Sequence, residues 1–260
     1  AHLEINSYFR NLDMKKLVIF DLDGTLLYTV PDIAAATNQA LAACGYPVHS
    51  ETDIASFIGN GINKLFERAL PENARSQEEV LRIRSLFLPY YGEHCADMTR
   101  PFDGIPELLA GICRHGIKVA VASNKYHPAT VKLMRHFFPE IPFCAVFGER
   151  EGVPRKPEPE IVWDILRVAG ISVSDDGRGS VLYVGDSGVD MQTAANAGLE
   201  AVAVTWGCRT REELASYSPA HIVDRPEQIA DILFNGTSCR CLDGESRPTH
   251  ADASSLRDSI

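Results

Sequence analysis

From Pro101 onward the chain alternates between segments patterned as helices and short apolar segments patterned as strands. Helices are predicted over 105–115, 127–137, 158–169, 190–197 and about 226–234, and strands over 117–122, near 144–147, over 181–185 and over 201–205. An apolar, β-branched segment at 17–20 predicts another buried strand. Alternation of this kind requires right-handed crossovers, so the sequence predicts an α/β fold: a doubly wound parallel sheet with helices on both faces.

Between the first strand and Pro101 the chain is patterned as helices only. Pro31 lies where a first helical turn begins, Ser76 and Glu79 have capping-box spacing, and Pro89 is expected to kink or end the last helix. We therefore expect a core domain of residues 14–27 and 99–234, a helical domain over 28–98, and hinges near 27–29 and 99–103. Residues 1–13 are expected to be an N-terminal extension and 235–260 a polar, disordered tail.

Polar residues follow three of the predicted strands at their carboxyl ends, where open parallel sheets bind ligands. They are Asp21 and Asp23 after the first strand, Ser123, Asn124 and Lys125 after strand 117–122, and Asp186 and Asp190 after strand 181–185. Lys156, in a loop before a helix, could reach the same place. The sequence therefore predicts one crevice assembled from segments more than 160 residues apart.

The residue types in this crevice suit phosphoryl transfer. Neighbouring carboxylates repel each other unless a cation or proton lies between them, and oxygen ligands of this kind suit Mg²⁺. Asp21 could attack phosphorus, and Asp23 could protonate the leaving oxygen and later activate water. Ser123 could hold phosphate oxygens, while Lys156 would offset the developing negative charge.

Asp186 would add a third anionic ligand, and Asp190 could orient a metal-bound water or the lysine. Structural roles also remain open: Ser123 and Asn124 could cap a helix, and Asp190 could be an ordinary first-turn acid. Lys156 could be a solvated surface lysine. The eight histidines show no ligand spacing, so zinc is not expected.

Four motifs, in this order, resemble those of the haloacid dehalogenase superfamily of phosphatases: Asp21-Leu-Asp-Gly-Thr25, Ser123-Asn-Lys125, Arg155-Lys156-Pro157 and Gly185-Asp-Ser-Gly-Val-Asp190. The resemblance spans about residues 14–234 and implies that Asp21 is the nucleophile and Asp23 the acid/base. It also implies phosphate contacts from Ser123 and Lys156, and a Mg²⁺ site made of Asp21, the Asp23 backbone carbonyl and Asp186. Thr25 is a further candidate phosphate-binding residue. The helical segment resembles the C1-type cap of this superfamily.

Within the superfamily the chain is similar to bacterial phosphoglycolate phosphatases. The similarity lies in Phe57-Ile-Gly-Asn-Gly-Ile62, in Asn124-Lys125 and in Arg155-Lys-Pro-Glu-Pro159. It implies hydrolysis of 2-phosphoglycolate, whose carboxylate would meet backbone N–H groups at Gly59, Asn60 and Gly61. Lys64 or Lys125 could add positive charge, and Asn124 is a further candidate for binding the substrate or its phosphate. Alternatively, residues 59–61 are only a tight turn between two helices.

Three other functions stay open: a phosphatase of another small ester (a sugar phosphate, nucleoside monophosphate or pyrophosphate), a phosphomutase, and a non-catalytic regulatory binding module. The formal net charge of −10 argues against binding to nucleic acid or to anionic membranes. No apolar run approaches the length of a membrane span, and seven scattered cysteines are typical of reduced thiols, so a cytoplasmic protein is expected. The sequence carries no interface signature, so a monomer and a homodimer both stay open.

Overall fold

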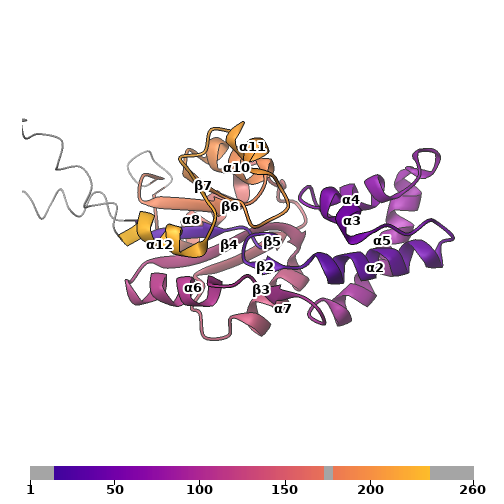
Figure 1. Ribbon diagram of the computed structural model, residues 1–260, viewed down its shortest axis with the longest axis horizontal. Helices are drawn as coiled ribbons and strands as arrows, with labels where there is room; N and C mark the ends of the chain where they lie inside the picture. The colour runs from indigo at the N-terminus through magenta and orange to yellow at the C-terminus, as the bar shows by residue number, and fades with distance from the viewer. Residues whose placement is uncertain (1–14, 173–177, 235–260) are drawn as a thin grey trace, which may run out of the picture.

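The computed structural model describes residues 15–172 and 178–234 and shows a parallel sheet between two helical layers, with a helical segment at one end (Figure 1). Its strands are β1 (Leu17–Phe20), β4 (Lys118–Tyr126), β5 (Ala145–Glu149), β6 (Val181–Gly185), β7 (Glu200–Val204) and β8 (His221–Val223), in the order β5-β4-β1-β6-β7-β8. The chain builds outward from β1 to one side and then crosses to β6 on the other. This topological switch lies at the carboxyl end of β1.

Helices α6 (Ile105–Arg114), α7 (His127–Phe137) and α12 (Pro226–Phe234) cover one face of the sheet. Helices α8 (Glu160–Ala169), α10 (Gly188–Ala197) and α11 (Arg211–Ala215) cover the other. Val18 and Phe20 pack into the first layer and Leu17 and Ile19 into the second, so every side chain of β1 is buried. Two buried faces explain the uninterrupted apolar sequence of this strand. The predicted fold class is confirmed.

Residues between β1 and β4 form α2 (Val30–Ala43), α3 (Glu51–Phe57), α4 (Ile62–Ala69), the short 3₁₀ helix η1 (Glu72–Ala74) and α5 (Gln77–His94). We call α2–α5 the helical unit. Ser50 and Asp53 form a capping box at the start of α3, and Ser76 accepts a hydrogen bond from the Glu79 amide at the start of α5. Helix α5 continues through Pro89, so the prediction of a helix end there was wrong. The two turns around Pro89 bury Phe87 and Tyr91, and this packing keeps the helix continuous.

A two-stranded antiparallel ribbon connects the helical unit to the core. It pairs β2 (Leu27–Tyr28) with β3 (Arg100–Pro101), which are the two stretches where hinges were expected. Asp32 in α2 accepts hydrogen bonds from the Met98 and Thr99 amides, which ties the two ends of the unit together. The ribbon, β8 and α11 were not predicted, because two- to five-residue elements carry no readable period.

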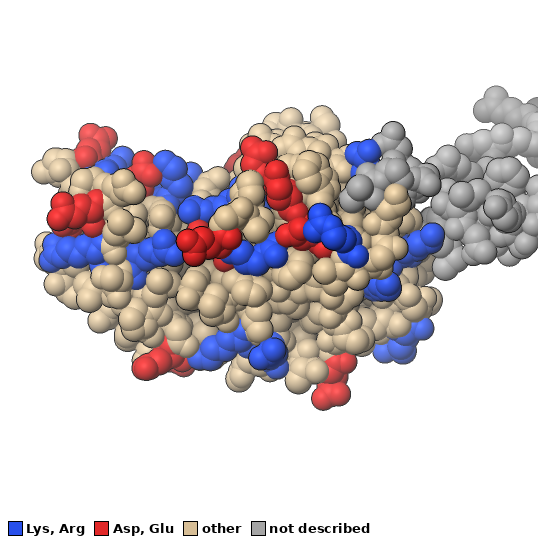
Figure 2. Space-filling view, turned by 180° about the vertical axis from the view of Figure 1, so that it is seen from behind, with Lys and Arg blue, Asp and Glu red and all other residues tan. Residues whose placement is uncertain are grey.

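Several sequence predictions concern residues 1–13 and 235–260, which lie outside the described residues. Among residues 15–172 and 178–234, no helix is both long and apolar enough to cross a membrane. The five cysteines described are all free thiols, and only Cys95 is fully buried. Figure 2 shows one face of the molecule, on which basic and acidic side chains are interspersed.

Candidate active site

Residues that follow β1 and β6, together with the carboxyl end of β4, meet the helical unit around one pocket. From the core, the pocket is lined by Asp21, Asp23, Ser123, Asn124, Lys125, Tyr126, Lys156, Asp186, Ser187, Cys208 and Arg209. From the helical unit, it is lined by Ile33, Ile58, Gly59, Gly61, Ile62, Leu65, Phe87 and Tyr91. The core side is therefore polar and charged, and the opposite side is largely apolar.

Lys156 is the central cation of the core side. Its ammonium donates to Asp21 Oδ1 at 2.8 Å and to Asp190 Oδ1 at 2.7 Å, and its side chain is only 2% exposed. The carbonyl of Ala122 at 2.9 Å and the hydroxyl of Tyr183 at 3.2 Å share its remaining donor. Lys156 is therefore buried and hydrogen-bonded within the protein, and the alternative of a solvated surface lysine is excluded.

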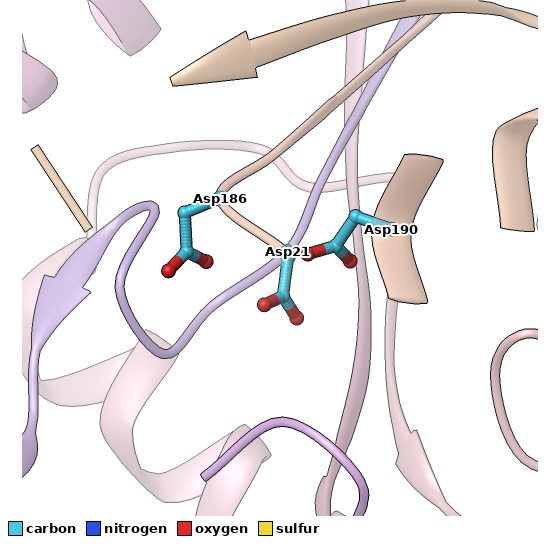
Figure 3. Close-up of side chains that lie close together, drawn as sticks. All are labelled: Asp21, Asp186 and Asp190. Carbon is cyan, nitrogen blue, oxygen red and sulfur yellow. The ribbon is translucent and has the colours of Figure 1, made fainter. Parts of the chain in front are cut away.

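Asp21, Asp186 and Asp190 bring carboxylate oxygens within 4.8 Å of one another. Figure 3 shows Asp190 pointing from helix α10 toward Asp21, with Asp186 on the other side of Asp21. Burial, reinforced by the charge of Asp190, raises the pKa of Asp21 to about 8 and that of Asp186 to about 7. The positive charge of Lys156 is therefore too small to offset the burial of Asp21 and Asp186, and the pKa of both carboxyl groups stays raised.

The donor set fits a divalent cation held by Asp21 and Asp186. Both oxygens of Asp190 are already used, one by Lys156 and Tyr183 and the other by the amide and hydroxyl of Ser187. Asp190 is therefore suited to hold the lysine in place. Buried carboxylates with raised pKa values bind a hard cation favourably, because it removes their mutual repulsion.

Two glycines make room for the Asp186 carboxylate. Gly24 has a φ of +86°, and a Cβ there would collide with the carboxylate of Asp186, as would a Cβ at Gly207. Asp186 accepts hydrogen bonds from the Thr25 hydroxyl at 3.1 Å and the Cys208 amide at 2.8 Å. The close approach of backbone on both sides explains why the turn after Asp23 contains glycine.

Thr25 is fully buried and does not line the pocket. Its bond to Asp186 makes it a support for that carboxylate, contrary to the predicted phosphate contact. The reason is local: the turn at Gly24 directs the threonine hydroxyl toward the β6 loop.

Asp23 is held by a threonine and a lysine. The Thr29 hydroxyl donates to Asp23 Oδ1 at 2.7 Å, and the Lys125 ammonium lies 2.9 Å from Oδ1 and 3.3 Å from Oδ2. On its other side the ammonium lies 4.7 Å from the centre of the Tyr91 ring. Lys125 is thus directed into the protein and bonded, with a side chain 5% exposed.

Ser123 and Asn124 do not cap helix α7, because β4 continues to Tyr126 and no side chain caps that helix. Ser123 lies buried in the pocket floor, where its hydroxyl accepts a hydrogen bond from the Lys125 amide. The Asn124 side chain binds both the amide and the carbonyl of Lys156 and donates to the carbonyl of Gly59. Asn124 therefore holds the backbone of Lys156 in place and contacts the helical unit at Gly59.

The helical unit differs from the prediction at two residues. Lys64 is exposed and paired with Glu67 at 2.6 Å, outside the pocket lining. Asn60 is also outside the lining, and its side chain accepts a hydrogen bond from Arg68. The spacing of residues along α4 turns Lys64 toward solvent, whereas Gly59 and Gly61 reach the pocket.

Sequence reasoning missed Arg209, Tyr91 and Tyr183. The Arg209 guanidinium donates to the carbonyl of Ile58 at 2.9 Å, so it joins the core to the end of α3. Tyr183 donates to Asp190 Oδ1 from within β6, where its aromatic ring had only indicated a buried strand residue. None of the three has a local sequence signal, because each acts on residues distant along the chain.

Comparison with known proteins agrees with this architecture. The model of the haloacid dehalogenase-like hydrolase family matches residues 18–204. A phosphoglycolate phosphatase of Pectobacterium atrosepticum is 34% identical over 225 residues, covering 84% of this chain and 92% of that protein. An N-acetylmuramic acid 6-phosphate phosphatase of Pseudomonas aeruginosa is also 34% identical, over 235 residues, covering 87% and 97%.

Among solved structures, that of a predicted phosphoglycolate phosphatase from Haemophilus somnus superposes with a TM-score of 0.76. It is 29% identical and covers 84% of this chain and 97% of that one. The carboxylate and lysine cluster lies at the topological switch of the parallel sheet, where open α/β sheets bind their ligands. The chain belongs to the haloacid dehalogenase-like hydrolases, and within them it is a phosphatase.

Proposed function

We propose that this phosphatase hydrolyses a small phosphate monoester, with 2-phosphoglycolate as its substrate, in a Mg²⁺-dependent reaction through an aspartyl-phosphate on Asp21. The observation that carries the proposal is the placement of Asp21. Its carboxylate lies at the carboxyl end of β1, lines the pocket, and has only one oxygen held by Lys156. The other oxygen is the nucleophile.

The chain's own residues supply each step. Asp21 attacks phosphorus and the ester P–O bond breaks, while Asp23 delivers a proton to the departing oxygen. Asp23 then takes a proton from water as that water attacks the phosphorus of the aspartyl-phosphate, which releases phosphate and restores Asp21. Lys156, beside Asp21, offsets negative charge on the phosphoryl group, and Ser123 lines the pocket where the phosphoryl oxygens would bind.

Asp21, Asp186 and the backbone carbonyl of Asp23 would hold the Mg²⁺, which supplies positive charge against the phosphoryl group when bound. Asp190 has no free oxygen for this role and keeps Lys156 beside Asp21.

Two features of the pocket support a small acidic substrate. Gly61 and Ile62 line it at the start of α4, so the first amides of an eight-residue helix lie at the pocket wall. Such a helix start favours a carboxylate. Arg209 lines the same pocket and adds positive charge near the helical unit. The relatives named phosphoglycolate phosphatase agree with this substrate.

A sugar phosphate is the second candidate, and the apolar side of the pocket favours it. Ile33, Ile62, Leu65 and Phe87 form a wall that offers a glycolate no polar partner. Carbon-rich faces of a sugar derivative would pack there. The relative that acts on N-acetylmuramic acid 6-phosphate has comparable identity and coverage.

The decisive experiment measures phosphate release with Mg²⁺ from 2-phosphoglycolate, N-acetylmuramic acid 6-phosphate, glucose 6-phosphate, a nucleoside monophosphate and pyrophosphate. We expect the highest kcat/KM for 2-phosphoglycolate. A preference for the sugar esters would transfer the assignment to the second candidate. Phosphorylated sugar isomers formed without free phosphate would indicate a mutase, and no turnover of any ester would leave only a binding module.

Asp21→Asn tests the nucleophile. The neutral amide neither attacks phosphorus nor offers an anionic oxygen to the metal, so turnover should fall to the uncatalysed level while the circular dichroism spectrum stays unchanged. Trapping of phosphate on the wild-type protein, detected as an acid-stable mass increase that this variant lacks, would support the aspartyl-phosphate directly. Near-normal activity in Asp21→Asn would refute the assignment.

A further inference from the structure

Lys125 is a buried lysine whose positive charge is paired with a carboxylate inside the protein. Its side chain is 5% exposed, that of Asp23 is 13% exposed, and the two form an ion pair with a shortest separation of 2.9 Å. A buried ammonium needs a carboxylate partner, and breaking such a pair is strongly unfavourable. Lys125 is therefore committed to Asp23 and has little freedom to reach a substrate.

The other side of the ammonium faces the helical unit. The ring of Tyr91, in α5, lies 4.7 Å from Lys125 Nζ and is held by stacking on Phe87, with ring centres 4.9 Å apart. Tyr91 is 3% exposed, and its hydroxyl has no hydrogen-bond partner among the described residues. A desolvated ammonium over an aromatic face is attracted to it. Lys125 thus lies between a core carboxylate and a ring of the helical unit.

Both short contacts to Asp23 fall on the same oxygen. Thr29 donates to Oδ1 at 2.7 Å and Lys125 reaches Oδ1 at 2.9 Å, whereas among the described residues Oδ2 has only the longer 3.3 Å contact with Lys125. Thr29 directly precedes α2, so it too is joined to the helical unit. The carboxylate is held by one oxygen, and the other is the one left for proton exchange with a ligand.

We propose that Lys125 and Tyr91 are positioning residues for the acid–base carboxylate of Asp23, so that docking of the helical unit on the core aligns Asp23 with the departing oxygen. The inference rests on the proposed function and deepens it. It replaces the sequence-based expectation that Lys125 binds substrate. The helical unit then contributes to proton transfer through a chain of contacts from Tyr91 to Lys125 to Asp23.

Leaving-group dependence distinguishes this role from substrate binding. An alkyl phosphate needs protonation of its departing oxygen, whereas p-nitrophenol departs as a stable anion without it. The value of kcat/KM reports the steps up to release of the first product. Lys125→Met should therefore lower kcat/KM for phosphoglycolate and for glycerol 3-phosphate by about 10²-fold or more, the size of a general-acid effect. For p-nitrophenyl phosphate the loss should stay below about tenfold.

Each alternative role of Lys125 gives another pattern. Equal losses on all three esters would mean that Lys125 binds the phosphoryl group, and a loss confined to phosphoglycolate would mean that it binds the carboxylate. Either result overturns the proposal. Because glycerol 3-phosphate carries no carboxylate, its rate distinguishes binding of the carboxylate by Lys125 from the other two roles. Failure of the wild-type protein to hydrolyse any ester would instead refute the proposed function.

Asp23→Asn provides the double-mutant test. If Lys125 acts through Asp23, the variant carrying both Asp23→Asn and Lys125→Met should be no slower on alkyl esters than Asp23→Asn alone. Multiplied losses would show independent roles and overturn the inference. Lys125→Arg, which keeps the positive charge, should recover part of the alkyl-ester activity.

Substitutions of Tyr91 test whether the helical unit contributes to the positioning of Asp23, and they do so even if Lys125→Met does not fold. Tyr91→Leu removes the aromatic face and should reproduce the selective loss, while Tyr91→Phe keeps the ring and should lose less. The matched control is Lys132→Met, since the Lys132 ammonium also reaches from the core to α5, at the Gly92 carbonyl, but lies outside the pocket. Equal effects of Tyr91→Leu on alkyl and aryl esters would contradict the proposed chain of contacts.

Discussion

Asp21 shows how burial sets the chemistry of a single carboxyl group. Desolvation, the charge of Asp190 and a smaller effect of Asp186 raise its pKa from 3.8 to about 8, although Lys156 opposes them. The folded protein therefore binds the Asp21 proton more tightly than the unfolded chain does. The resulting contribution to stability is complete below about pH 4 and is lost as the pH rises toward 8.

Metal binding should therefore release protons. A cation binds ionised carboxylates, so the affinity for Mg²⁺ should rise as the pH increases from 6 to about 8 and then level off. Calorimetric titration with Mg²⁺ in two buffers of different ionisation enthalpy would measure the released protons. We expect clear release at pH 7 and little at pH 9, and a smaller release at pH 7 in Asp21→Asn, where only Asp186 remains to lose a proton. Larger release at pH 9 than at pH 7 would contradict the raised pKa.

Helix α7 depends at its first residue on a neutral histidine. His127 Nδ1 accepts a hydrogen bond from the Gly148 amide at 3.1 Å, which joins the helix to β5. Burial, together with the nearby charge of Arg150, holds the pKa of His127 below its ordinary value of 6.5. A positive charge at a helix start is also unfavourable. The contact is therefore stable above about pH 6.5 and weakens as the pH falls below that value.

Acid should thus destabilise the wild-type protein more than a variant without this histidine. The urea concentration at the midpoint of unfolding should decrease between pH 7.5 and pH 5.5, and this decrease should be larger for the wild type than for His127→Gln. The exposed His136, in the last turn of the same helix, provides the control, since His136→Gln should retain the wild-type difference. Identical losses in the wild type and His127→Gln would show that another group causes the acid sensitivity.

At the scale of the whole molecule, several polar contacts between the helical unit and the core gather around the loop that follows α3. Arg209 donates to the carbonyl of Ile58 and Asn124 to that of Gly59, and both partners follow α3. The cation at the end of α3 is also favoured by the helix dipole. The pocket lies between the helical unit and the core, which the β2–β3 ribbon also joins.

Loss of the Arg209 contact should loosen this arrangement. Arg209→Ala should raise KM several-fold and increase the radius of gyration measured by small-angle scattering. Arg211→Ala, which removes an exposed pair with Asp224, should change neither quantity. An unchanged KM and radius of gyration in Arg209→Ala would mean that the remaining contacts alone hold the helical unit against the core.

Local sequence patterns predicted much of the architecture. An apolar β1 implied a buried strand, and the capping residue Ser76 marked a helix start correctly. Polar residues after three strands implied a shared crevice, because parallel strands end at one edge of a sheet. These inferences succeeded since they depend on neighbours within a few residues or on a rule that holds for every sheet of this kind.

Which side chains face the crevice was decided only by the tertiary structure. Thr25 and Lys64 belong to segments that predicted substrate contacts. In the structure Thr25 donates to Asp186, and Lys64 is exposed to solvent. Tyr91, Lys125 and Asp23 come from three distant segments and meet only after the helical unit packs on the core. By itself the sequence determined the sheet and the location of its reactive edge, because these follow from local periodicity. The partners of each charge depend on packing between segments far apart in the chain, which no local pattern encodes.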